Sequence, residues 1–210
     1  MSVETEGLSC MRAADAAEPF VAVQVPDADW QDSLVLMLRA AGLPCDGFAA
    51  PEDLLLPPFA TAPRRVALTM GPRGRLPHAA APVAALRAAG VAAPVLMLVP
   101  GPVEPALACR LLAMGEAEVL ENLSATPTVL SALRLLAEGV VQPADAPLSP
   151  LARRALGMML GGRSRRTIAG ALAMRLPDLD ALVADAVAAL AVPGPVALLR
   201  AARQKGLLPS

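Results

Sequence analysis

Few side chains in this sequence can serve as a nucleophile, a general base or a metal ligand. The chain of 210 residues has one histidine, His78, and three widely spaced cysteines, Cys10, Cys45 and Cys109. A catalytic nucleophile needs a base beside it, and His78 lies in a proline-rich stretch that offers no such nucleophile. Zinc sites and disulfide frameworks need paired or clustered Cys and His. The sequence therefore predicts a non-enzymatic protein with reduced cysteines, no catalytic residue, no metal and no cofactor.

Two carboxylates, Asp27 and Asp29, directly follow an apolar stretch typical of a strand, Phe20–Val25. Acids at this place are solvated or cap the next helix, and the alternative is a pair of acids that act together in catalysis. Because no third acidic partner is evident, we interpret them as capping or solvated residues. The later stretch 100–102, Pro-Gly-Pro, is a rigid turn rather than a phosphate-binding loop, since proline has no N–H to donate.

Charge is unevenly distributed along the chain. The stretch 148–210 holds nine basic and three acidic residues, a net charge of +6. The preceding stretch holds the other nine basic and sixteen acidic residues, a net charge of −7, and together the two give the −1 of the whole chain. A surplus of positive charge favours contact with nucleic acid. The neutral total therefore conceals a basic C-terminal part behind an acidic N-terminal part.

Up to about residue 140, stretches typical of strands alternate with helical patterns, as expected for a parallel sheet with crossover helices. The predicted strands are Phe20–Val25, Cys45–Phe48, Arg65–Met70, Val95–Val99 and Glu118–Leu120. The predicted helices are Trp30–Ala41, Ala79–Ala89, Glu104–Met114 and Thr126–Glu138. A further helix that begins near Asp53 should be cut short, because Pro57 and Pro58 interrupt it.

The stretch 140–147 contains two prolines and no periodic apolar pattern, so it predicts a linker between a domain at 18–139 and a domain at 148–210. Beyond it, Ser149 and Ser164 stand where helix N-caps are expected. The predicted helices are Pro150–Leu160, Arg165–Ala173, Asp178–Ala191 and Pro195–Lys205. Short helices that meet across a brief turn are typical of a helix-turn-helix.

The C-terminal part carries four short motifs, in this order: Leu148-Ser149-Pro150, Gly161-Gly162-Arg163-Ser164, Ile168-Ala169 and Gly206-Leu207-Leu208. They resemble the LuxR-type helix-turn-helix of the FixJ/NarL response regulators. The stretch 21–43 is similar to the first strand and helix of the receiver domain of that family, and the stretch 110–121 to a later part of it. The resemblance implies an α/β receiver-like domain with a flavodoxin-like, doubly wound parallel five-stranded sheet, followed by an all-α four-helix LuxR-type domain.

The resemblance also shows where receiver chemistry is missing. Receivers hold magnesium on an acidic pair and accept a phosphoryl group on an aspartate, and here the pair falls at Val25 and Pro26 and the phosphoacceptor position on Met70. The receiver lysine falls at Asn122. A thioether cannot form an acyl phosphate, and Asp27 alone is a poor magnesium site. We therefore expect a degenerate receiver, a pseudo-receiver for dimerisation or for sensing a signal or partner, that works without phosphorylation.

In the family, the third helix of the C-terminal domain presents basic residues to DNA. The positions that match it here include Asp178, Asp180, Leu182, Ala184 and Ala189. The basic residues expected to bind DNA lie around that helix instead: Arg163, Arg165, Arg166 and Arg175. The sequence thus predicts a cytoplasmic transcription regulator. The alternative is a protein-interaction regulator that does not bind DNA and acts on another response regulator, a kinase or a transcription component.

A homodimer is also expected, because receivers of this family pair through the fourth and fifth helices, here 104–114 and 126–138. The candidate dimer face consists of Arg110, Leu130, Leu133 and Arg134, although the leucines would equally serve to pack the helix on the sheet. Membrane contact is not expected, since no apolar run reaches the roughly 18 residues that a spanning helix needs. The expected partners are therefore DNA, a second copy of the chain and a further protein.

Overall fold

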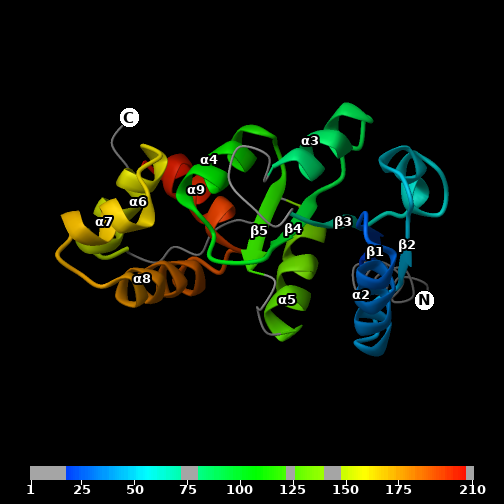
Figure 1. Ribbon diagram of the computed structural model, residues 1–210, viewed down its shortest axis with the longest axis horizontal. Coiled ribbons are helices and arrows are strands. Elements are labelled where there is room, and N and C mark those ends of the chain that lie inside the picture. The colour runs from blue at the N-terminus through cyan, green and yellow to red at the C-terminus, as the bar shows by residue number, and fades with distance from the viewer. Residues whose placement is uncertain (1–17, 72–79, 122–125, 140–147, 207–210) are drawn as a thin grey trace, which may run out of the picture.

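The computed structural model describes residues 18–71, 80–121, 126–139 and 148–206 (Figure 1). Its strands are β1 (Phe20–Gln24), β2 (Cys45–Gly47), β3 (Arg65–Met70), β4 (Val95–Val99) and β5 (Ala117–Glu121). Its first four α-helices are α2 (Ala28–Ala40), α3 (Ala81–Ala88), α4 (Pro105–Ala113) and α5 (Thr126–Ala137). The C-terminal part consists of α6 (Pro150–Leu160), α7 (Arg165–Ala171), α8 (Leu176–Ala189) and α9 (Pro195–Gln204).

The five strands form one parallel sheet in the order β2-β1-β3-β4-β5. Helices α2 and α5 cover one face of the sheet, and α3 and α4 cover the other (Figure 1). This order is that of a flavodoxin-like, doubly wound sheet. Coverage on both faces explains why β4 is apolar at every position, since neither of its faces meets water. The structure confirms the predicted α/β fold and the four-helix C-terminal part.

The crossover between β2 and β3 lacks an α-helix, as the prolines predict. It consists of two short 3-10 helices, Pro51–Leu55 and Phe59–Thr61, on either side of Pro57 and Pro58. Prolines at these positions remove N–H donors that a continuous helix would need. The buried side chain of Phe59 packs against the rings of Phe20 and Phe48, so the short turns still cover the sheet.

Three helices begin at N-caps that the sequence indicates. The side chains of Asp27, Ser149 and Ser164 accept hydrogen bonds from the backbone N–H three residues further on, at 3.1, 3.1 and 3.2 Å. Each bond satisfies one of the N–H groups that a helix leaves unpaired at its start. Asp27 therefore has the capping role that was one of its two expected interpretations.

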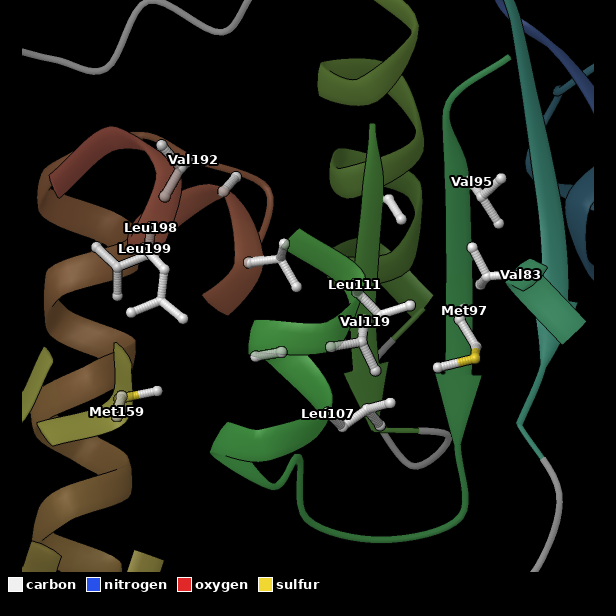
Figure 2. Close-up of a cluster of buried hydrophobic side chains, with 14 of the residues drawn as sticks. Val83, Val95, Met97, Leu107, Leu111, Val119, Met159, Val192, Leu198 and Leu199 are labelled. Carbon is white, nitrogen blue, oxygen red and sulfur yellow. The ribbon is translucent and has the colours of Figure 1, made fainter. Parts of the chain in front are cut away.

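The C-terminal helices share an apolar core with the sheet. One cluster of buried side chains lies between the sheet and the pair α2 and α5. A second cluster fills the other face and continues from α3 and α4 into α6, α7, α8 and α9. In Figure 2 its labelled members run from Val95 and Met97 of β4, through Leu107 and Leu111 of α4, to Leu199 of α9. The packing of α9 on α4 and β5 therefore joins the two parts of the chain.

Several features of the sequence analysis lie outside the described residues: the expected linker at 140–147, Cys10, His78, Asn122 and the end of the last motif, Leu207-Leu208. The division into domains at 18–139 and 148–210 stays a prediction. Within the described ranges, no helix combines the length and the apolar character needed to cross a bilayer.

Candidate nucleic-acid interface

The helices α6, α7 and α8 are joined by two short turns. Gly162 adopts a φ of +67° between α6 and α7, a left-handed conformation that glycine tolerates without strain. Ile168 and Ala169 of α7 and Leu179 of α8 are buried, so their packing fixes α7 against α8. This local arrangement positions the four arginines that the sequence analysis singled out.

Arg165 is engaged with α8. Its Nε donates to Asp180 Oδ1 at 3.1 Å, and its Nη2 bonds the other carboxylate oxygen. The two bonds form a bidentate pair, which fixes the plane of the guanidinium. The Arg165 side chain is only 16% exposed, so much of its surface is already covered.

Arg175 is likewise paired, with the first turn of α8. Its Nε and Nη2 donate to the Asp178 carboxylate at 2.9 and 2.8 Å, and its backbone N–H donates to the same group at 3.3 Å. These hydrogen bonds from Arg175 hold the pKa of Asp178 below its ordinary value. Because both groups lie at the surface, the pair contributes little to stability.

Arg163 and Arg166 are the other two of the four arginines expected to bind DNA. Both are exposed, and within the described part of the chain neither forms an ion pair. They lie on either side of Ser164 and Arg165, at the start of α7. By contrast, the charges of Arg165 and Arg175 are neutralised by Asp180 and Asp178 of α8. Among these four arginines, the positive charge that is available to a phosphate therefore lies mainly at Arg163 and Arg166.

The candidate dimer face needs one correction. Leu133 is completely buried and belongs to the cluster between α5 and the sheet, so it cannot take part in a surface. Leu130 is half-buried, and Arg110 is exposed on α4. The Arg134 guanidinium bonds the Glu18 carboxylate at 3.0 and 3.1 Å. Helix α4 also packs against α6 and α9, so part of its surface is covered by the same chain and cannot contact a second copy.

The positions that match a receiver's phosphorylation site meet at the carboxyl edge of the sheet. Met70, Val25 and Pro26 line one cavity of about 700 Å³ together with Asp27. Asp27 is the one carboxylate among the described residues that line this cavity, and it caps α2. Asn122 lies outside the described residues. A lone carboxylate between apolar neighbours is a weak magnesium site.

Sequence reasoning missed one buried carboxyl, Glu118 of β5, which is 0% exposed. Its Oε1 accepts hydrogen bonds from Val119 N and Val196 N, both at 2.9 Å, and its Oε2 accepts one from Ala197 N at 2.8 Å. Burial raises the pKa of Glu118 to about 7, although these hydrogen bonds act to lower it. The signal in the sequence was an acid at the start of a predicted strand, between the apolar Ala117 and Val119.

The described residues contain no cluster of three or more His, Cys, Asp or Glu placed to hold a metal ion. Cys45 and Cys109 are free thiols, and burial raises the pKa of each.

No family model and no curated protein matches this sequence. Among solved structures, the chain is similar to full-length FixJ from B. japonicum, at 20% identity and a TM-score of 0.44, over 92% of this chain and 100% of that one. It is also similar to the response regulator ChrA of a heme-sensing two-component system, at 18% identity and a TM-score of 0.42, over 91% and 99% of the two chains. A third similar structure is the RcsB response regulator of Salmonella typhimurium, at 16% identity and a TM-score of 0.41, over 87% and 97%.

Proposed function

We propose that this protein is a transcription regulator that contacts DNA through its C-terminal helices and works without phosphorylation of its receiver-like part. The observation that carries the proposal is the helical pair α7 and α8 with Arg163 and Arg166 exposed at its start. The net charge of +6 over 148–210 supports the same conclusion. In this proposal the receiver-like part serves for dimerisation or for sensing a signal or partner.

Fluorescence anisotropy with labelled genomic duplex fragments tests the DNA contact. Neutralised phosphates release counterions, so the observed affinity should fall steeply as salt is raised. A chain that binds no fragment even at low salt would refute the proposal.

We predict that replacement of both Arg163 and Arg166 with glutamine weakens DNA binding about tenfold at moderate salt and lowers the salt slope by about one per arginine. The reason is that both side chains are exposed and free of ion pairs with described residues, so each can meet a phosphate. Replacement of the exposed Arg154 of α6 and Arg203 of α9 with glutamine is the matched control, because it removes the same two charges. Equal losses in the control and in the double variant would show only a general effect of net charge.

We also predict that acetyl phosphate and magnesium leave the intact mass and the DNA affinity unchanged. Met70 has no carboxylate to accept a phosphoryl group, and Asp27 is held by Trp30 N–H at 3.1 Å as the cap of α2. Intact-mass spectrometry, with an anisotropy titration before and after treatment, makes this measurement. A phosphorylated product that loses its label in Asp27→Asn would contradict the prediction.

A second candidate function is favoured by the ion pairs of α8. Two of the four arginines are already bonded to Asp180 and Asp178, and the adjoining surface of α8 carries the exposed Ala184 and the half-buried Leu182. Such a face suits a protein partner better than a DNA groove. The protein would then regulate another response regulator, a kinase or a transcription component. Co-purification of such a partner, with no salt-dependent DNA binding, would support this function over the first.

A further inference from the structure

The contact between β5 and α9 depends on one carboxyl. Glu118 accepts hydrogen bonds from Val196 and Ala197, the second and third residues of α9, so a side chain of the sheet caps a helix of the C-terminal part. The approach is close: a Cβ at Gly194 would lie 2.8 Å from Glu118 Cδ. The carboxyl is therefore enclosed by strand, helix and the turn before the helix.

A cavity with two further charged residues lies beside this carboxyl. A cavity of about 120 Å³ adjoins Glu118, which is room for a few water molecules. Besides Glu118, the charged described residues that line it are Glu116, directly before β5, and Arg200 of α9. Arg200 Nη2 donates to the Gly115 carbonyl at 2.6 Å and acts to lower the pKa of Glu118.

We propose that Glu118 is a proton-operated latch that docks α9, and with it the C-terminal helices, on β5 and α4. The docked state is favoured when the buried carboxyl is neutral, and it weakens when the carboxyl is ionised. The residues that form this contact fit the role, because Glu118 belongs to the sheet, Val196 and Ala197 belong to the C-terminal helices, and they meet at the shared core. Undocking exposes the carboxyl to water, where its charge is solvated.

The direction of the pH effect follows from the two environments. The docked carboxyl has a pKa of about 7, against 4.5 for the exposed group. Because the pKa is higher in the docked state, the neutral carboxyl stabilises that state fully below pH 4.5, the pKa of the exposed group. That stabilisation is lost as the pH rises through about 7, the pKa of the docked group. Between pH 6 and pH 8 the docking equilibrium constant should therefore fall about tenfold.

Docking also affects α8. Asp180, Val183 and Val187 of α8 line a cavity of about 390 Å³ whose opposite wall includes Val119 and Leu120 of β5. The docked arrangement therefore turns this side of α8 toward the sheet. If α8 takes part in DNA binding, as the proposed function holds, DNA affinity should rise from pH 6 to pH 8. Only this consequence rests on the proposed function, because the latch itself is measured without DNA.

Hydrogen exchange of the full-length chain, followed by NMR, tests the latch. The protection factors of Val196 and Ala197 amides, each taken relative to the intrinsic rate at the same pH, should fall about tenfold between pH 6 and pH 8. The amide of Leu38, buried on α2 at the other face of the sheet, should keep its protection. A constant protection of the α9 amides, or an equal fall at Leu38, would overturn the proposal, since the latter indicates whole-chain unfolding.

Three variants sharpen the test. Glu118→Gln has a neutral side chain of similar shape and should abolish the pH dependence at Val196 and Ala197, whereas the exposed Glu121→Gln on the same strand should retain it. Arg200→Gln removes the cation that lowers the Glu118 pKa, so the fall in protection should move to higher pH. An unchanged midpoint in Arg200→Gln, or a pH dependence that persists in Glu118→Gln, would equally refute the latch.

Discussion

Leu133→Ala is expected to lower the free energy of unfolding by about 2–5 kcal/mol, the usual cost of a large-to-small change in a core. Leu133 is 0% exposed and packs between α5 and the sheet with Val129 and Leu136. The neighbours cannot collapse into the space without moving α5, so a cavity should remain. Urea unfolding followed by circular dichroism measures the loss.

The same variant separates core packing from dimerisation. If Leu133 acts only in the core, Leu133→Ala at a temperature where it stays folded should keep the molar mass of the wild type in light scattering. Leu130→Ala and Arg134→Gln, at two half-buried neighbours on α5, are the variants that should weaken a dimer through α5. A loss of dimer in folded Leu133→Ala, with no loss in Arg134→Gln, would contradict this assignment.

Local signals in the sequence predicted the elements well. The strands Arg65–Met70 and Val95–Val99 have the predicted bounds, because short, mostly apolar runs between turn residues are typical of buried parallel strands. The helix caps at Ser149 and Ser164 were also predicted, because an N-cap depends only on the residue itself and the next three. The pairing of Arg175 with Asp178 is similarly local and could have been found from the spacing alone.

Contacts between distant residues could not be predicted in this way. Arg165 meets Asp180 fifteen residues away, and Arg87 of α3 donates to the carbonyl of Glu116, 29 residues away, at 3.0 Å. Glu118 meets α9 after 78 residues. Charge counts treat these groups as free surface charges, whereas the fold engages each with a particular partner. The sequence therefore predicted where the basic residues lie but not which of them remain available to bind a ligand.

Gly194→Ala is expected to destabilise the protein by about 2–4 kcal/mol, a large effect for one added methyl group. The backbone itself tolerates alanine, because Gly194 has an extended conformation with φ of 174°. The cost arises from the side chain, whose Cβ would lie 2.8 Å from Glu118 Cδ and 2.9 Å from its Oε1. The carboxyl must then leave the N–H groups of Val196 and Ala197, and these lose their partner in a buried site.

The matched control is Gly157→Ala in α6, where no heavy atom lies within 4 Å of the new Cβ. That change should stabilise the protein by about 0.5–1 kcal/mol, because alanine favours a helix more than glycine does. A double-mutant cycle then identifies the cause. Glu118→Asp shortens the side chain that the methyl group would meet, so its loss and that of Gly194→Ala should be less than additive. Additive losses would mean that Gly194 acts independently of Glu118, and that the close approach of turn and carboxyl does not control the docking of α9.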